Sequence, residues 1–174
     1  MRTIGVAIPI PDPWSAQIQR FREGIGDPMA DHIPPHITLV PPVDLAPAVA
    51  AEVVCHLEAA AAAVAPFEVH LRGTATFRPL SPVVFIALAE GISGCEQLER
   101  HVRSGLLGVD LTYPYHPHVT VAHEVSDAEL DRAFTELSDF EARFTVDSFT
   151  LYVHDDGVGW VPSRTFGLRS VIAR

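Results

Sequence analysis

The stretches PHITL (residues 35–39) and PHVTV (residues 117–121) carry one pattern: proline, histidine, an apolar residue, threonine and a second apolar residue. At ordinary residue frequencies, only about one histidine in 40 is followed by an apolar residue, Ser or Thr, and another apolar residue. Two such matches among nine histidines are therefore hard to attribute to chance. The two copies stand at corresponding points of the two halves of the chain, which indicates an internal duplication.

Each copy is predicted to lie on a β-strand with one face in a cleft and the other in a core. Side chains at positions i and i+2 of a strand point to the same face. His36 and Thr38 should therefore project together, as should His118 and Thr120. The apolar residues between them should face the core.

The secondary-structure elements expected around the two motifs follow the same order in both halves. PFEVHLRG (residues 66–73) in the first half also resembles RFTVDSFT (residues 143–150) in the second. Hydrophobic periodicity and breaker residues predict strands at 3–10, 36–43, 67–77, 83–89 and 118–125, helices at 14–26, 47–64, 92–108 and 126–140, and a closing hairpin of 142–156 with 159–171.

This order predicts an α+β fold in which residues 1–174 form a single domain of two duplicated lobes. Antiparallel sheets should face a central cleft, with helices on the outside. Three local signals set boundaries: Pro41 and Pro42 should end the second strand, Ser93 should cap the helix at 92–108, and Ser126 with Glu129 forms a capping box.

Composition narrows the class of protein and of partner. Apolar residues make up 48% of the 174 residues, which fits a globular domain, and the net charge of −10 should repel a long polyanion. We expect a monomer in the cytoplasm that binds no membrane and no long nucleic acid. The proline-broken residues 1–14 do not resemble a signal peptide, and Cys55 and Cys95 are expected to be buried free thiols.

Two imidazoles that face each other can share acid–base work near neutral pH. A neutral imidazole takes a proton from an attacking water, while a protonated one gives a proton to the leaving oxygen. Cleavage of a phosphodiester needs both steps, and the hydroxyls of Thr38 and Thr120 could donate to the non-bridging phosphate oxygens. This chemistry needs no metal or other cofactor.

The paired motifs and their spacing resemble those of the two-histidine phosphoesterase superfamily, in its bacterial 2'-5' RNA ligase-like or RNA 2',3'-cyclic phosphodiesterase branch. The resemblance covers essentially the whole chain. It implies that His36 and His118 hydrolyse cyclic phosphates or 2'-5' linkages as an acid–base pair while Thr38 and Thr120 hold phosphate. Some members of that family can also join RNA ends in the reverse direction without ATP, so this activity could accompany hydrolysis here.

The substrate and the individual roles stay open at this point. Members of the family that act on RNA tend to be more basic, so small cyclic phosphates or nucleotides fit the charge better than an RNA end. Which histidine is the base is not assigned. Two rivals remain: a non-catalytic binder of a cyclic nucleotide or phosphorylated metabolite, and a metallohydrolase that uses His116, His118 and His154.

Other side chains are candidates for contacts around the pair. Arg78 could bind phosphate. Tyr115, Phe77 and Trp160 could each bind the substrate by stacking on its base, or could instead be packing residues. His116 is expected at the mouth of the cleft or as a residue that orients a neighbour. His123 should face away from His118, on the core side, if its strand is regular.

Overall fold

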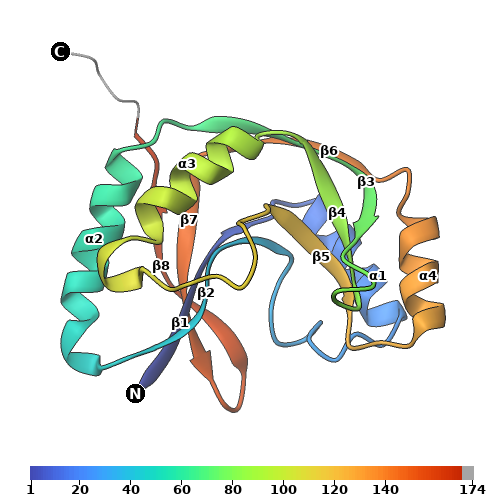
Figure 1. Ribbon diagram of the computed structural model, residues 1–174, viewed down its shortest axis with the longest axis horizontal. Coiled ribbons are helices and arrows are strands. Elements are labelled where there is room, and N and C mark those ends of the chain that lie inside the picture. The colour runs from blue at the N-terminus through green and yellow to red at the C-terminus, as the bar shows by residue number, and fades with distance from the viewer. Residues whose placement is uncertain (170–174) are drawn as a thin grey trace.

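Eight strands form two four-stranded antiparallel sheets in the computed structural model, which describes residues 1–169. The predicted α+β class with paired antiparallel sheets is thus confirmed (Figure 1). In spatial order, the first sheet contains β2 (His36–Leu45), β1 (Arg2–Pro9), β7 (Ser148–Asp155) and β8 (Gly159–Gly167), and the second contains β5 (His118–His123), β4 (Val83–Glu90), β3 (Phe67–Thr76) and β6 (Glu141–Val146).

The two halves of the chain exchange strands. β1 of the first half pairs with its neighbour β2 on one side and with β7 of the second half on the other. β3 of the first half likewise pairs with β4 on one side and with β6 of the second half on the other. The motif strands β2 and β5 occupy equivalent edge positions, next to β1 and β4. Neither half of the chain contains all the strands of either sheet.

The strand equivalence differs from the one that the sequence suggested. PFEVHLRG lies mainly on β3, and the strand in the equivalent position of the other sheet is β7. RFTVDSFT instead spans the junction of β6 with β7, and β6 pairs directly with β3. The local likeness of the two stretches therefore does not mark corresponding strands.

Four helices lie outside the two sheets and are also shared between them (Figure 1). The helix that connects β1 to β2 packs against β5, and the helix that connects β4 to β5 packs against β2 and β3. The helices are α1 (Trp14–Gly24), α2 (Ala50–Ala62), α3 (Ile92–Val102) and α4 (Asp127–Glu136), with short 3-10 turns η1 (Pro47–Val49) and η2 (Gly105–Leu107).

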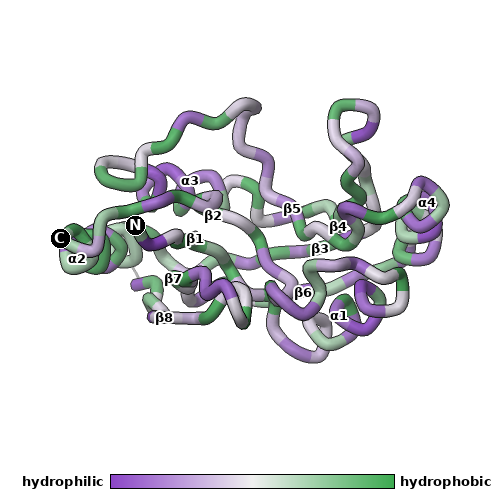
Figure 2. The backbone as a smooth tube through the Cα atoms, turned by 90° about the horizontal axis from the view of Figure 1, so that it is seen from below, coloured by the Kyte–Doolittle hydropathy of each residue, from purple (hydrophilic) through white to green (hydrophobic). Residues whose placement is uncertain are grey.

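Apolar side chains on alternate strand positions form the core, as expected for sheets with one covered face. In β6, for example, Ala142, Phe144 and Val146 are buried while the residues between them are exposed. Figure 2 shows apolar and polar residues interleaved along the chain. None of the helices among residues 1–169 is long and apolar enough to cross a lipid bilayer.

Two strand boundaries differ from the prediction for clear physical reasons. β2 continues through Pro41 and Pro42 to Leu45, because an edge strand has an open side on which a proline needs no amide partner. The expected strand at 142–156 is two strands separated by Asp147, which pair in different sheets. The closing hairpin of β7 with β8 is confirmed over the described residues, and Ser170 and Val171 lie outside them.

The helices expected at 126–140 and 92–108 both begin where predicted, but only the first has the predicted cap, and α3 ends at Val102, before the separate 3-10 turn η2. The side chain of Ser126 caps α4 by accepting a hydrogen bond from the amide of Glu129. Gly91, at a φ of 96°, is the N-cap of α3, so Ser93 lies inside the first turn and makes no cap. Cys95 is buried as expected, whereas Cys55 is exposed on α2.

The two serines provide a matched test of the cap. Replacing Ser126 with alanine should lower the free energy of unfolding by about 1 kcal/mol, because an amide of the first turn loses its acceptor. Replacing Ser93 with alanine should change it by less than about 0.5 kcal/mol. Urea denaturation of both variants measures the difference, and equal losses would contradict the assignment of the cap.

Candidate functional site

The two motif strands contact each other where the sheets meet. On β2, His36 and Thr38 are half-buried while Ile37 is fully buried. On β5, His118 and Thr120 are likewise half-buried. The prediction that each histidine shares a face with its threonine is therefore confirmed, and the fold brings the two faces to one place.

Each motif histidine is oriented by the backbone carbonyl two residues before it. Nδ1 of His36 lies 2.8 Å from the carbonyl oxygen of Pro34, and Nδ1 of His118 lies 2.7 Å from that of His116. A carbonyl oxygen can only accept, so each Nδ1 carries the proton and donates it. In the neutral rings, the lone pair is then on Nε2, the atom that remains for chemistry.

Both imidazoles favour the neutral form. Burial lowers the pKa of His36 to about 4, with further lowering by the positive charges of Arg22 and His118, against the hydrogen bond to Pro34. Burial also lowers the pKa of His118. The hydrogen bond to the His116 carbonyl raises that pKa by less, and the charge of the His116 ring lowers it slightly.

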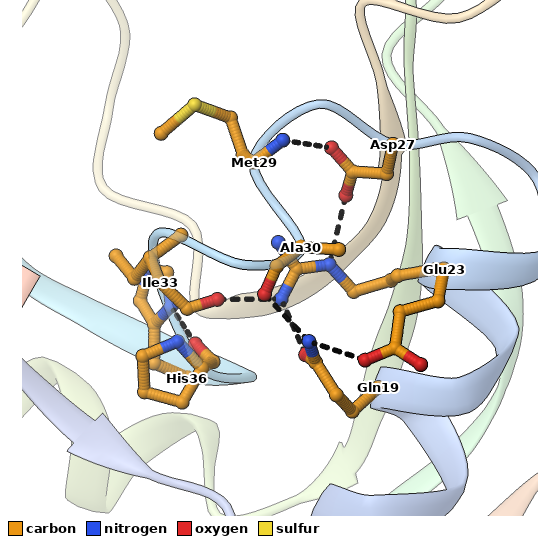
Figure 3. A network of polar contacts seen from close by, with 9 residues as sticks. Gln19, Glu23, Asp27, Met29, Ala30, Ile33 and His36 are labelled. Atoms are coloured by element: carbon orange, nitrogen blue, oxygen red, sulfur yellow. Dashed lines mark hydrogen bonds and ion pairs between the residues drawn. The ribbon is translucent and has the colours of Figure 1, made fainter. Parts of the chain in front are cut away.

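A buried ion pair fixes the loop that leads into His36 (Figure 3). Arg22 of α1 is only 4% exposed; its Nε donates to Asp27 at 2.8 Å and its Nη1 to the carbonyl of Ile33 at 2.7 Å. Asp27 in turn accepts from the amide of Met29 at 2.9 Å. The loop is thus held next to the carbonyl of Pro34 that orients His36.

Two cavities adjoin at Thr38, which lines both of them. The larger cavity, of about 570 Å³, is lined by His118 and Thr120. The smaller cavity, of about 190 Å³, is lined by His36. Figure 2 shows the loop between β3 and β4 and the segment between α3 and β5 rising on the same side of the sheets. Residues of both segments line the larger cavity.

A bulge follows the threonine in both motif strands. Thr38 and Val40 pair with consecutive residues of β1, so that one extra residue of β2 stands between them. Thr120 and Ala122 pair with consecutive residues of β4 in the same way. Such a bulge shifts the alternation of side chains by one position.

The bulge corrects the expectation for His123. The strand is not regular, so His123 is exposed and lines the larger cavity together with His118, rather than facing the core. The sequence carries a signal for the bulge. Two apolar residues in succession follow each threonine, whereas a strictly alternating strand would have a polar residue at the second position. They are Leu39 and Val40 in β2, and Val121 and Ala122 in β5.

Aromatic rings pack against His118. Phe77 lies edge-on to His118, with ring centroids 5.0 Å apart, and Phe85 lies 5.2 Å from it. The ring of His116 stacks on that of His118, with centroids 6.3 Å apart, and lines the larger cavity. Its backbone carbonyl orients His118, so both expected positions, at the cleft and as an orienting neighbour, agree with the structure. Phe77 also contacts Phe85, which leaves less of its ring for a ligand.

The polar groups of Tyr115 and Arg78 bind other parts of the protein. The hydroxyl of Tyr115 donates to the carbonyl of Thr38 at 2.8 Å, and burial raises its pKa, so the proton stays in place. Tyr115 lines the larger cavity but also ties the two motif segments together. Arg78 binds Asp131 of α4 at 2.8 Å and is not among the residues that line the cavity.

The remaining candidates lie on the β7–β8 hairpin. Trp160 lines the smaller cavity, where a methyl group added to Gly5 would stand 3.2 Å from its ring. His154 contacts Trp160 edge-on at 5.2 Å and pairs with Asp156. Among residues 1–169, no three His, Cys, Asp or Glu side chains are grouped so that they could hold a metal ion, and this includes the set His116, His118 and His154.

The sequence is similar to one protein family and to several proteins named as phosphoesterases. Residues 10–158 match the family described as the 2'-5' RNA ligase superfamily. A Bacillus pumilus protein named "Putative phosphoesterase" is 31% identical over 142 residues, which cover 80% of this chain and 82% of that protein. A Bacillus licheniformis protein with the same description is 30% identical over 80% of this chain and 83% of its own length.

Solved structures show the same fold. E. coli LigT complexed with 3'-AMP superposes with a TM-score of 0.71 at 20% identity, covering 97% of this chain and 99% of LigT. LigT complexed with ATP gives a TM-score of 0.66 at 23% identity over 97% and 99% of the two chains. TT0787 of Thermus thermophilus gives 0.64 at 21% identity over 99% and 100%.

The environment of His36 predicts its titration. In the folded protein, its ring should bind a second proton only near pH 4 and should carry its proton on Nδ1 at neutral pH. In urea, the same ring should titrate near its ordinary value of 6.5. Two-bond ¹H–¹⁵N correlation spectra over a pH series report both quantities; a midpoint above pH 6 in the folded protein would refute the prediction.

Proposed function

The chain belongs to the 2'-5' RNA ligase superfamily, and we propose that this protein is a metal-independent phosphodiesterase that opens 2',3'-cyclic phosphates. The observation that carries the proposal is the matched anchoring of two histidines. His36 and His118 both bind a carbonyl through Nδ1, which leaves the lone pair of each neutral ring on Nε2. Two such nitrogens supply the base and the acid that phosphodiester cleavage requires.

The proposed reaction uses one water molecule and needs no other reactant. One Nε2 takes a proton from water as its oxygen attacks phosphorus. The bond from phosphorus to one ribose oxygen breaks, and the other histidine gives that oxygen a proton. Thr38 and Thr120 donate hydrogen bonds to the non-bridging oxygens, where negative charge accumulates. If the 5'-hydroxyl of a second RNA strand takes the place of water, the same base accepts its proton, its oxygen bonds to phosphorus as the bond to one ribose oxygen breaks, and the same acid protonates that ribose oxygen, which joins the two RNA ends.

We assign the role of base to His36 and the role of acid to His118. A base must be neutral before the reaction, and the pKa of His36 is lowered to about 4 by burial and by the charge of Arg22. Arg22 is itself held by Asp27, so its charge stays near His36 throughout. His118 has no arginine among the causes of its shift.

The likeness to LigT supports a small nucleotide as the substrate. LigT has been solved with 3'-AMP and with ATP, and the cavities here have volumes that suit ligands of this size. The net charge of −10 also disfavours a long RNA strand over a mononucleotide or a strand end. A monomer suffices, since both motifs come from one chain.

Single substitutions test both the activity and the two roles. His36→Ala and His118→Ala should each lower kcat for adenosine 2',3'-cyclic phosphate by about 10²- to 10⁴-fold. With a diester that releases p-nitrophenolate, which leaves without a proton, His118→Ala should recover most of its activity and His36→Ala should not. Product formation is followed by phosphorus NMR and by absorbance.

The outcomes separate the proposal from its rivals. Recovery in His36→Ala instead of His118→Ala would reverse the two roles while leaving the reaction in place. Binding of the cyclic phosphate by wild-type protein without any turnover would establish the non-catalytic binder. Loss of wild-type activity on addition of EDTA would establish a metal-dependent enzyme.

The lowered pKa values also predict an acidic optimum. Catalysis needs one neutral and one protonated histidine: below the lower pKa both are charged and no base remains, and above the higher pKa both are neutral and no acid remains. The profile of kcat/KM should therefore be bell-shaped, with its maximum between about pH 4 and 6.5. A profile that is flat from pH 5 to 8 would exclude the acid–base pair.

A further inference from the structure

The segment that leads into β2 is held by its backbone carbonyls. Pro34 and Pro35 have no amide hydrogen, so the placement of this segment depends on what its carbonyls bind. Donors from α1, β8 and the residue after β1 bind the carbonyls of Ala30, His32, Ile33 and Pro35; these donors are the side chain of Gln19, the amide of Trp160, the side chain of Arg22 and the amide of Ile10. The carbonyl of Pro34, within this series, accepts from Nδ1 of His36.

Arg22 joins the start of this loop to its end (Figure 3). Its Nε binds Asp27, where the loop begins, and its Nη1 binds the carbonyl of Ile33, three residues before His36. A guanidinium is planar and rigid, so it holds its two partners in a fixed relation to each other. Arg22 and Asp27 are both buried, and buried charges are tolerated when they are paired and hydrogen-bonded.

The second motif has a similar arginine at a greater distance along the chain. Arg103, the C-cap residue of α3, pairs with the buried Glu99 and donates to the carbonyl of Val109 at 2.6 Å. Val109 lies nine residues before His118, whereas the carbonyl that Arg22 binds lies three residues before its histidine. An arginine anchor thus bears directly on the first motif histidine and not on the second.

The charged groups that act on His36 come from α1 and β5. Burial lowers the pKa of His36 most, and the charges of Arg22 and His118 lower it further, against the hydrogen bond to Pro34. The carboxylate of Asp27 is bound to Arg22. The arginine that holds the loop therefore also opposes a second proton on the ring, which suits a base.

We propose that Arg22 and Asp27 are positioning residues for the reaction: their ion pair places the carbonyl of Pro34 so that it holds the Nδ1 proton of His36 and leaves the Nε2 lone pair to act as the base. This rests on the proposed function. Neither Arg22 nor Asp27 is among the residues that line the two cavities at the motifs, so the pair acts through the backbone and not on the substrate. Its loss should therefore lower kcat and leave KM nearly unchanged.

Two matched double variants test this role. Arg22→Met with Asp27→Leu removes both charges, because a single substitution would leave the other charge buried without its partner. It should lower kcat for adenosine 2',3'-cyclic phosphate by about 10- to 100-fold and keep KM within about threefold of wild type. The control, Arg103→Met with Glu99→Leu, removes the comparable pair and should keep kcat within about threefold. A wild-type kcat in the first variant, or equal losses in both, overturns the proposal.

The variant Arg22→Lys separates placement from charge. Lysine keeps the positive charge but replaces two donors fixed in one plane by a single ammonium group. Its kcat should fall by about 3- to 10-fold, with the acidic limb of the pH profile still near pH 4. In Arg22→Met with Asp27→Leu the acidic limb should move to higher pH, because the charge that opposes protonation of His36 is gone. A wild-type kcat in Arg22→Lys, or an unmoved limb in the double variant, contradicts the assigned role of Arg22.

Spectra of the histidine rings keep this inference separate from the proposed reaction. If wild-type protein hydrolyses no cyclic phosphate, the proposed function fails, and two-bond ¹H–¹⁵N correlation spectra still report the state of His36. In Arg22→Met with Asp27→Leu, the neutral ring of His36 should become a mixture of tautomers, while His118 keeps its proton on Nδ1. A wild-type tautomer of His36 overturns the proposal. If this variant does not fold, Asp27→Asn is measured in its place, and a wild-type tautomer there has the same consequence.

Discussion

The pairing of β1 with β7 and of β3 with β6 joins residues from opposite halves of the chain, and the position of both motif strands depends on it. Because each sheet combines strands from both halves, β2 and β5 become edge strands that meet where the sheets adjoin. The helices strengthen this arrangement, since α1 packs against β5 and α3 against β2. The site therefore lies at the seam of two interlocked units.

Within that seam, backbone groups rather than charged side chains orient the two histidines. The carbonyls of Pro34 and His116 accept the Nδ1 protons and so determine that Nε2 carries the lone pair of each neutral ring. A carbonyl orients the ring without carrying a full negative charge, so the imidazole is not strongly stabilised as a cation. This fits the lowered pKa values of both rings, which a carboxylate partner would instead have raised.

The sequence predicted what depends on local periodicity and missed what depends on distant partners. The shared faces of His36 with Thr38 and of His118 with Thr120 follow from strand geometry alone, as does the cap at Ser126. The position of His123 required knowledge of a bulge, and a single strand does not reveal its register with β4. The hydrogen bond of Tyr115 and the ion pair of Arg78 with Asp131 join residues more than 50 positions apart, which no pattern along the chain encodes.

The exchange of strands also bears on how the chain folds during synthesis. β1, at residues 2–9, can pair with β2 soon after both emerge from the ribosome, but its other edge needs β7, which ends at residue 155. That edge stays open until β7 has been made, and pairing over such a separation is slow because a long loop must close. The same topology that unites the two motifs thus delays completion of the first sheet until β7 and β8 have emerged.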